Sequence, residues 1–210
     1  MNDLIIIGAG GMGRTIYNVA QESIGFLTDF KIKGFINDIP SALDGFVGYP
    51  PIVDSIVDYV PKSNDVFINT IGAPERILCI KSLINKGAKF INLVHKSARI
   101  GTNVRMGIGN IIGAFTTLGP DVKIGNYNMI QSYTVIGHDS KIGDFNRIDT
   151  HVTCVGGIEI KNETTIHTSA VINHNVVVED RAKVGACSFV IRKVKSGDTV
   201  LGVPAKRYEL

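Results

Sequence analysis

Between Ile100 and Val190 every sixth residue is apolar, and no insertion breaks this register. Fourteen of the sixteen positions are Ile, Leu or Val, and eight are followed directly by Gly. A period of six fits neither the turn of a helix nor the alternation of a single strand. It is typical of a parallel β-helix, in which short strands joined by tight corners each point one aliphatic side chain inward. We expect the glycines to serve corners that need a positive φ or a close approach of the backbone.

The first part of the chain carries a different pattern, in which strands and helices alternate. The apolar run at residues 2–7 predicts a buried strand, and residues 14–24 have the apolar spacing of one helix face. Between them lies the sequence GAGGMG, at residues 8–13. In the order strand, G-x-G-x-x-G, helix, such a loop lets backbone N–H groups approach an anion, and the helix N-terminus attracts phosphate. A βα turn without a ligand is the alternative interpretation.

Further strands are predicted at residues 31–37, 65–71 and 90–94, and helices at residues 52–60 and 74–86. The first of these helices would be stopped by Pro61, whereas the second has Pro74 in its first turn and Gly87 just past its end. Together the elements predict a small α/β domain with a parallel sheet over residues 1–94. A β-helix domain with a C-terminal cap would follow over residues 95–210.

The predicted α/β domain corresponds to one half of a Rossmann fold. Asp38, near the end of its second predicted strand, stands where such a fold contacts a ribose. A dehydrogenase would need a second nucleotide-binding half and a catalytic acid beside the nicotinamide. The β-helix begins directly instead, so hydride transfer is disfavoured.

The composition narrows the classes of function further. The formal net charge is +3 with charges of both signs interspersed, which is not the pattern of a nucleic-acid-binding protein. No apolar run is long enough for a membrane span, and the apolar run before Gly8 is too short for a secretory signal. The three cysteines, Cys79, Cys154 and Cys187, form neither a disulfide framework nor a zinc pattern. We expect a reduced, cytoplasmic protein in which Cys154 is a core residue.

Three features, in this order along the chain, are similar to one known family. They are the glycine loop, an uninterrupted series of hexapeptides of the form [LIV]-G-x-x-[STAV]-x, and GVPAK at residues 202–206. They resemble the sialic acid O-acetyltransferase-like family of hexapeptide-repeat acetyltransferases. That family includes bacterial N-acetyltransferases of nucleotide-linked 4-amino sugars, of the bacillosamine and perosamine type. The joint at residues 92–98 is also similar, so the resemblance covers essentially the whole chain.

The resemblance implies a left-handed parallel β-helix with triangular coils of three hexapeptides, assembled as a homotrimer. It implies that the α/β domain holds the nucleotide of a sugar nucleotide, and that acetyl-CoA, as co-substrate, binds between adjacent subunits. An amine or hydroxyl of the sugar would then attack the thioester directly, helped by one histidine and without a metal. The implied partners are these small molecules and further copies of the chain, not nucleic acid or a membrane. The implied setting is bacterial surface glycan synthesis.

A coil of eighteen residues singles out two of the five histidines. His138, Gly156 and His174 are eighteen apart in turn, so they should form one column, with the histidines about 10 Å apart at about 4.8 Å per coil. Gly156 would leave a notch in which its N–H could stabilise the developing charge of a thioester carbonyl. Asp139, which follows His138, could polarise the imidazole ring. The remaining histidines, expected at structural positions or in other columns, are His95, His151 and His167.

The family's catalytic motif maps onto His138 as the general base and Asp139 as its polarising partner. The acetyl-CoA-binding residues that the resemblance implies are Gly156, Arg147, His174, Gly185, Ala186 and Pro204. The nucleotide-sugar-binding residues that it implies are Gly8, Gly10, Gly11, Met12, Gly13, Asn37, Asp38, Gly72 and Gln131.

Four of these residues depart from the family pattern. Asp139 replaces the commoner Glu, and Asn37 replaces the first acid of a common Asp pair. Met12 stands where some 4-amino-sugar enzymes carry a histidine near the substrate. Arg147 stands where related enzymes carry a second histidine near the acetyl group, so we expect it to contact a coenzyme phosphate instead. The sugar and the nucleotide stay open.

Three alternatives to N-acetylation follow from the same residues. O-acetylation of a sialic acid-type hydroxyl is the main one, and the sequence leaves that choice open. A non-catalytic sugar-nucleotide-binding protein is a remote one, because His138, Asp139, Gly156 and GVPAK are all retained. A γ-carbonic anhydrase, another left-handed β-helix enzyme, needs three zinc-binding histidines, and His138, His151 and His174 match no such arrangement.

Overall fold

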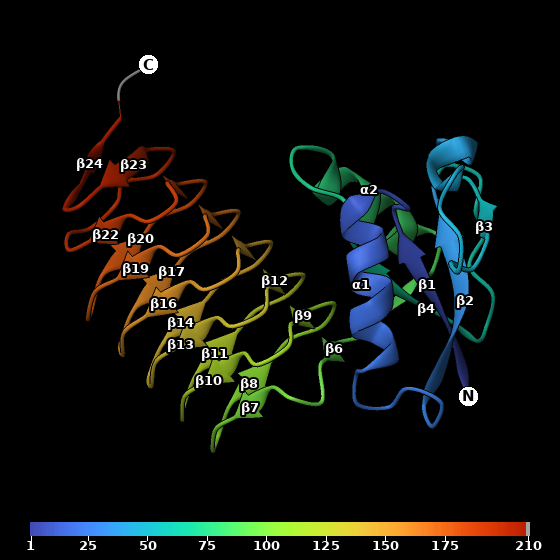
Figure 1. The fold of residues 1–210 in the computed structure, drawn as a ribbon, viewed down its shortest axis with the longest axis horizontal. Helices are drawn as coiled ribbons and strands as arrows, with labels where there is room; N and C mark the ends of the chain where they lie inside the picture. Colours follow the sequence, from blue (N-terminus) through green and yellow to red (C-terminus); the bar gives the residue numbers. More distant parts are fainter. Residues whose placement is uncertain (209–210) are drawn as a thin grey trace. The chain divides into compact units, whose positions relative to one another are not determined.

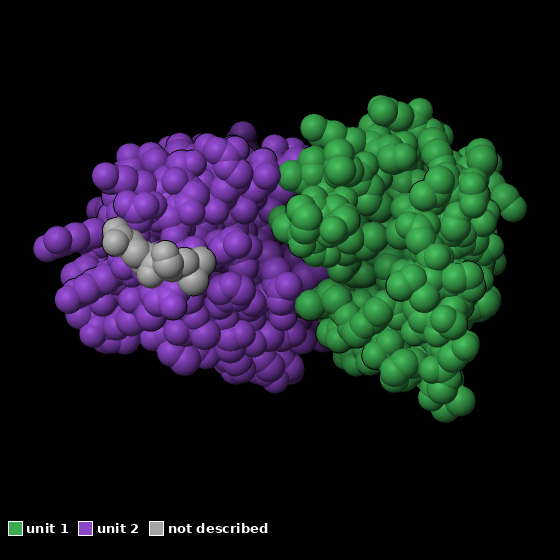
Figure 2. Space-filling view, turned by 90° about the horizontal axis from the view of Figure 1, so that it is seen from above, with its two compact units in different colours: residues 1–94 green, residues 95–210 purple. Residues whose placement is uncertain are grey.

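The computed structural model describes residues 1–208, and Figure 1 draws its ribbon. The chain divides into two compact units, Met1–Val94 and His95–Leu210, which Figure 2 colours separately. Unit 1 contains both α-helices of the described chain, and unit 2 is built from short strands. None of the described helices is long and apolar enough to cross a lipid bilayer.

Unit 1 is a five-stranded sheet in the order β3-β2-β1-β4-β5, and every neighbouring pair is parallel. Its strands are β1 Asn2–Ile7, β2 Phe30–Ile36, β3 Ile52–Asp54, β4 Asp65–Asn69 and β5 Lys89–Phe90. Its helices are α1 Gly11–Gln21, the 3₁₀ helix η1 Pro40–Leu43 and α2 Glu75–Asn85, and β6 Leu93–Val94 ends the unit. The predicted parallel α/β fold is confirmed. Because the strands are parallel, the carboxyl ends of β2, β1 and β4 lie side by side.

Two local predictions in unit 1 are wrong. The helix predicted at residues 52–60 is instead the edge strand β3 and a turn, because Ile52 and Asp54 pair with β2. The Asp38 carboxylate then accepts the N–H groups of Ile56 (2.7 Å) and Val57 (3.3 Å), which holds residues 55–58 in the turn. The strand predicted at residues 90–94 is divided into β5 and β6.

A buried polar triad ties β2 to the amino end of β4. Lys33 Nζ donates to Asp65 Oδ1 (2.7 Å) and to the Tyr59 hydroxyl (2.9 Å), and that hydroxyl donates to Asp65 Oδ2 (2.6 Å). The Lys62 N–H also donates to Asp65 Oδ2, at 2.8 Å. Asp65 is only 2% exposed, so its carboxylate has lost its contact with water. The buried charge is tolerated because these donors replace the water.

Unit 2 is the predicted β-helix of hexapeptide repeats, which is confirmed. The strands of its coils form three parallel sheets in which partners are eighteen residues apart, for example Ile130 with Ile148 and Ile136 with Cys154. Figure 1 shows the successive coils stacked along the length of the unit. Each predicted apolar residue is the second residue of a strand, and all are buried except Ile100 and Met106 in the first coil.

The two-residue strands of unit 2 are β7 Arg99–Ile100, β8 Arg105–Met106, β9 Ile111–Ile112, β10 Thr117–Leu118, β11 Lys123–Ile124, β12 Met129–Ile130, β13 Val135–Ile136, β14 Lys141–Ile142, β15 Arg147–Ile148, β16 Thr153–Cys154, β17 Glu159–Ile160, β18 Thr165–Ile166, β19 Val171–Ile172, β20 Val177–Val178, β21 Lys183–Val184 and β22 Phe189–Val190. A hairpin of β23 Thr199–Gly202 and β24 Ala205–Arg207 extends the sheet of β21 and closes the described chain. GVPAK spans the turn of this hairpin, with Val203 and Pro204 in the turn itself.

The repeat also points a second, partly polar column inward. Asn110, Asn128 and Asn146 are almost fully buried and stack one coil apart. The side-chain oxygen of Asn110 accepts the backbone N–H of Asn128 (3.0 Å), and that of Asn128 accepts the N–H of Asn146 (2.8 Å). The ladder satisfies amides that would otherwise lack partners in the dry interior. Their ladder also fixes the register of the coils.

Of the two reasons expected for the repeat glycines, close approach is correct and a positive φ is not. A Cβ on Gly137 would lie 2.6 Å from Gly156 N in the next coil, and one on Gly113 would lie 2.5 Å from Ser132 N. The positive φ falls instead two residues after the repeat glycine, for example at Asp139 (φ 59°).

Replacing Tyr59 by Phe tests the triad. The change removes one hydrogen bond from buried Asp65 and one from half-buried Lys33, so we expect the free energy of unfolding of unit 1 to fall by about 1–3 kcal/mol. Urea unfolding followed by circular dichroism at 222 nm reports on unit 1, because it holds both helices. Tyr133→Phe, at a half-exposed ring in unit 2, is the matched control. Equal stability of Tyr59→Phe and wild type would contradict the role of the triad.

The same triad predicts a dependence on pH. Burial raises the pKa of Asp65, but the donors Lys33, Tyr59 and the Lys62 N–H outweigh burial, and its pKa is lowered. A lowered carboxyl pKa stabilises the folded state above the ordinary Asp pKa, and this stability is lost as the pH falls through the folded value. We expect wild-type unit 1 to weaken below about pH 4, and Asp65→Asn to lack that part of the change. If the stability of both proteins fell equally with pH, protonation of Asp65 would be excluded as the cause of the acid sensitivity.

Candidate active site

The column of His138, Gly156 and His174 forms a compact polar corner of the β-helix. His138 Nδ1 lies 2.7 Å from Asp139 Oδ2, and the ring covers Gly156, where an added Cβ would lie 2.6 Å from His138 Cε1. The centroids of the His138 and His174 rings are 6.2 Å apart. This is shorter than the predicted spacing of two coils, because the His138 ring leans over the Gly156 notch.

The contact with Asp139 defines what the His138 ring can do. A proton on Nδ1 that is donated to the carboxylate leaves Nε2 as a proton acceptor, which is the arrangement of a general base. The side chains of His138 and Asp139 are 56% and 67% exposed, so a substrate can reach them from solvent. Asp139 has a φ of 59°, a backbone conformation that Asp tolerates better than most residues.

Gly156 supplies the backbone of this corner. Its N–H makes no hydrogen bond with any residue between 1 and 208, and the residue itself is buried. Any side chain here would meet the His138 ring. The arrangement combines a base, an unused N–H donor and a second imidazole on one corner, which suits a reaction that develops negative charge on a carbonyl oxygen.

A second polar cluster surrounds Asp149, which the sequence reasoning missed. Its carboxylate is buried and accepts from Arg147 Nε (2.6 Å) and Gln131 Nε2 (2.7 Å), and lies 3.2 Å from His167 Nδ1. The structure thus joins Arg147 and Gln131, predicted for two different ligands, through one carboxylate. The available signal was the column Gly113, Gln131, Asp149, His167, Gly185, where three polar residues interrupt the usual glycine.

The glycine loop of unit 1 connects the carboxyl end of β1 to the amino end of α1. Gly8 has a φ of 95°, and Gly13 sits so close to Gly8 that an added Cβ would lie 2.9 Å from the Gly8 carbonyl carbon. Gly10 is the N-cap of α1 and has no side-chain cap, and both Gly10 and Gly11 have open space where a side chain would be. Free N–H groups at an open helix N-terminus can bind an anion.

The two polar residues after β2 are partly committed to the fold. Asn37 Oδ1 accepts the Ala9 N–H of the glycine loop at 3.2 Å, and Asp38 Oδ1 caps the turn after β3. Met12 is half-buried in the first turn of α1. Sequence reasoning also missed Arg14, whose guanidinium carbon lies 3.6 Å from the centre of the exposed Phe46 ring beside this loop.

The remaining predicted residues lie on the surface or at the cap. Gly72 is exposed between β4 and α2 and has open space around its Cα. Ala186 and Pro204 are exposed, whereas Gly185 packs against the cap, where an added Cβ would lie 2.8 Å from Leu201 Cβ.

Two of the three cysteines, Cys79 and Cys154, are poorly suited to nucleophilic catalysis, whereas Cys187 is exposed. Burial raises the pKa of Cys154 to about 12 and that of Cys79 to about 11, so neither forms a thiolate near neutral pH. Within residues 1–208, no group of three or more His, Cys, Asp and Glu side chains is arranged to hold a metal ion. His95 is buried, with Nδ1 2.7 Å from the Ser97 hydroxyl.

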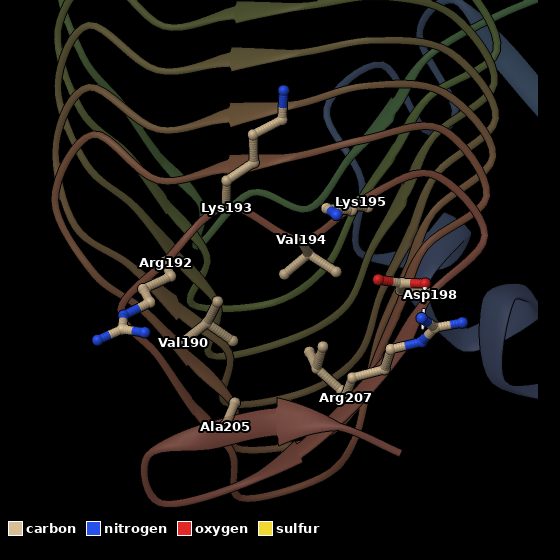
Figure 3. A pocket seen from close by; sticks show the side chains of 9 residues that line it. Val190, Arg192, Lys193, Val194, Lys195, Asp198, Ala205 and Arg207 are labelled. Carbon is tan, nitrogen blue, oxygen red and sulfur yellow. Dashed lines mark ion pairs between the residues drawn. The ribbon is translucent and has the colours of Figure 1, made fainter. Parts of the chain in front are cut away.

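A cavity of about 270 Å³ opens at the last coil, as Figure 3 shows. Val190, Val194 and Val200 line its interior, and Arg192 and Lys195 contribute cations. Two further cations are paired with acids, Lys193 with Glu179 and Arg207 with Asp198. The cavity contains none of the predicted site residues, although Ala205, next to Pro204, lines it.

Two sequence profiles match this chain. The profile described as the PglD N-terminal domain matches residues 3–76, and the profile described as bacterial transferase hexapeptide (six repeats) matches residues 103–138. Among curated proteins no sequence matches the chain. The two matches fall in unit 1 and unit 2 respectively.

Solved structures with the same fold cover almost all of the chain. WeeI from Acinetobacter baumannii AYE is 26% identical, with a TM-score of 0.86, over 99% of this chain and 100% of its own. PerB from Caulobacter crescentus, in complex with CoA and GDP-perosamine, is 21% identical, with a TM-score of 0.88, over 100% and 98%. The acetyltransferase domain of PglB from Neisseria gonorrhoeae FA1090, in complex with acetyl coenzyme A, is 21% identical, with a TM-score of 0.87, over 99% and 100%.

The fold of unit 2 and its match to bacterial transferase hexapeptides define a hexapeptide-repeat transferase. With a match to the PglD N-terminal domain before its match to transferase hexapeptides, the chain is similar to the PglD-type hexapeptide acetyltransferases in both units.

Replacing Gly156 by Ala tests the geometry of the corner. The added methyl group must displace the His138 ring, so we expect acetyl-transfer activity to fall at least about 10-fold while the coils stay folded. Gly143→Ala is the matched control, because its Cβ would lie 2.8 Å from Lys161 O in a column without histidines. It should cost stability but keep the activity of the folded enzyme. Equal activity of the two variants would show that ring displacement does not matter.

Proposed function

We propose that this chain is an acetyl-CoA-dependent N-acetyltransferase that acts on the amino group of a nucleotide-linked 4-amino sugar, in bacterial surface glycan synthesis. The observation that carries the proposal is the His138–Asp139 pair above Gly156. The family supports acetyl transfer. PerB with CoA and GDP-perosamine, and PglB with acetyl coenzyme A, support the two substrates.

In this reaction the sugar amine attacks the carbonyl carbon of the acetyl thioester. His138 Nε2 takes a proton from the attacking nitrogen, while Asp139 holds the Nδ1 proton and stabilises the imidazolium. The C–S bond then breaks, and His138 returns the proton to the leaving thiolate. The products are the N-acetylated sugar nucleotide and CoA with a free thiol.

The Gly156 N–H is the proposed donor to the oxyanion of the tetrahedral intermediate. Its lack of a hydrogen-bond partner among the described residues supports this role. We propose direct transfer, and Cys154 supports it, because this cysteine of the neighbouring coil strand is buried with a pKa of about 12 and is unsuited to carry an acyl group. His174, next to the His138 ring, and Arg147 are proposed to contact the coenzyme, together with Gly185, Ala186 and Pro204.

Unit 1 is proposed to hold the nucleotide. The open N-terminus of α1 and the free space at Gly10 and Gly11 suit its diphosphate. Asp38 has one carboxylate oxygen engaged in a turn, so only its other oxygen is available to a ribose or base. Gln131 in unit 2 is proposed to contact the sugar.

The active enzyme is proposed to be a homotrimer with acetyl-CoA between subunits. The outward residues of β10, β13, β16, β19 and β22 support self-association, because they are uncharged: Thr117, Val135, Thr153, Val171 and Phe189. Loss of charge is the compositional mark of the centre of an interface.

O-acetylation of a sugar hydroxyl is the second candidate function. A sugar hydroxyl needs more help from a general base than a neutral amine does, because it is the weaker nucleophile. A histidine hydrogen-bonded to an aspartate is the base that serine hydrolases use for a hydroxyl. The 2.7 Å contact between His138 and Asp139 is the observation that favours it.

Replacing His138 by Ala removes the proposed base. We expect turnover to fall by about 10²–10⁴-fold, because general-base assistance contributes that much. His151→Ala is the matched control, since His151 is another corner histidine, stacked on Tyr133 at 4.9 Å. Free CoA thiol released from acetyl-CoA is the measurement. Near-wild-type turnover of His138→Ala would remove the assignment.

The same assay names the acceptor. The panel holds UDP- and GDP-linked 4-amino sugars, free sialic acid and CMP-sialic acid. Release with one 4-amino sugar, and none with sialic acids, is the expected result. Release only with sialic acids would move the function to O-acetylation, and release with neither would contradict both candidate functions.

A further inference from the structure

Asn69 carries a buried hydrogen-bond acceptor that the protein leaves unused. The residue ends β4 and is 7% exposed. Its Nδ2 donates to the Ile71 carbonyl at 3.0 Å, but its Oδ1 is buried and meets no donor among residues 1–208. An unpartnered buried amide oxygen is uncommon in a folded protein, because it has given up water without a replacement.

The position of Asn69 connects this oxygen with the glycine loop. Asn69 is the register partner of Ile7, the last residue of β1, and Gly8 begins the loop directly afterwards. An added Cβ on Gly8 would lie 2.9 Å from Thr70 Oγ1 and 3.2 Å from Ile71 Cγ1, so the segment that anchors Asn69 packs against the loop. The carboxamide therefore belongs to the same edge of the sheet as the open N-terminus of α1.

Asn37, on the other side of β1, shows what such a carboxamide does at this edge. It follows β2, and its Nδ2 donates to the carbonyl two residues further on, Ile39, at 2.8 Å. Asn69 is anchored in the same way, to the carbonyl two residues further on. The two carboxamides differ in what their oxygens bind. Asn37 Oδ1 accepts the Ala9 N–H of the loop, whereas Asn69 Oδ1 accepts no hydrogen bond from any residue between 1 and 208. The glycine loop is thus bracketed by two like acceptors, one filled and one vacant.

We propose that Asn69 is a specificity-determining residue whose Oδ1 accepts a hydrogen bond from an N–H or O–H group of the nucleotide bound at the glycine loop. The inference rests on the proposed nucleotide-binding role of unit 1. The donor comes from the base or from a ribose hydroxyl, since the phosphates are acceptors. A nucleotide without a donor at this point leaves the oxygen unpaired in the complex and binds more weakly.

Asn69→Leu, which keeps the size and removes the acceptor, tests the proposal by calorimetric titration with UDP and GDP. For the nucleotide that wild type binds more tightly, the dissociation constant should rise by about 5- to 100-fold. The variant also loses the Nδ2 bond to the Ile71 carbonyl, so its melting temperature without nucleotide should fall, and affinity is compared at a temperature at which both proteins are folded. Asn64→Leu, at the exposed opposite end of β4, is the matched control and should bind as wild type does.

Analogues identify the donor. The 2′-deoxy nucleotide should weaken binding to wild type but not to Asn69→Leu if the ribose hydroxyl is the donor. A nucleotide methylated at the base N–H should do so if the base is the donor. If Asn69→Leu does not fold, Asn69→Asp replaces it in this test. Because Asp keeps an acceptor oxygen, this variant should bind the analogue that lacks the donor more weakly than the parent nucleotide, as wild type does.

Two outcomes would overturn the proposal, and they are distinguishable from failure of the proposed function. Unchanged nucleotide affinity in Asn69→Leu overturns the role of Asn69 alone. Failure of wild type to bind either nucleotide overturns the nucleotide-binding role of unit 1, and the inference with it.

Discussion

The eighteen-residue register of the coils is the constraint on which the candidate active site depends. Parallel pairing between successive coils places residues eighteen apart directly above one another. His138, Gly156 and His174 come together only through this pairing, and an insertion of one residue between them would separate them. Buried aliphatic side chains drive the stacking, and the inward asparagine ladder fixes its register because each amide must find its partner.

In unit 1 the constraint is the hydrogen bonding of polar groups at the carboxyl edge of the parallel sheet. A parallel sheet leaves unpaired polar groups where its strands end, and here the carboxyl ends of β2, β1 and β4 share one edge. Asn37 and Thr70 each satisfy a polar group of the glycine loop: Asn37 accepts the Ala9 N–H, and the Thr70 hydroxyl donates to the Gly8 carbonyl. The open start of α1 and one oxygen of Asn69 are left without a partner among the described residues, and this is where we propose that a nucleotide binds.

The fold was largely predictable because its signals are periodic and local. The six-residue period predicted every strand of the coils, and Pro74 and Gly87 bounded α2. The helix prediction for residues 52–60 was wrong because an edge strand of three residues has too few positions to show a period. Pairing of this strand with β2 outweighed the helical spacing of its apolar residues. The division between β5 and β6 was likewise decided by contacts distant in sequence.

The site was predictable only in part. The column of His138 followed from spacing alone, but the ring separation depends on side-chain rotamers, which spacing does not contain. Asp149 and Asn69 are ordinary residues in the sequence, and their interest comes from burial and from which partners they have or lack. Such properties depend on the folded structure.

The bond formed in the product tests the central claim most directly. With acetyl-CoA labelled in the acetyl group and a nucleotide 4-amino sugar, the account predicts a labelled product that resists alkaline hydroxylamine, because the acetyl group is in an amide. Labelled acetylhydroxamate released from the product would identify an ester and contradict N-acetylation.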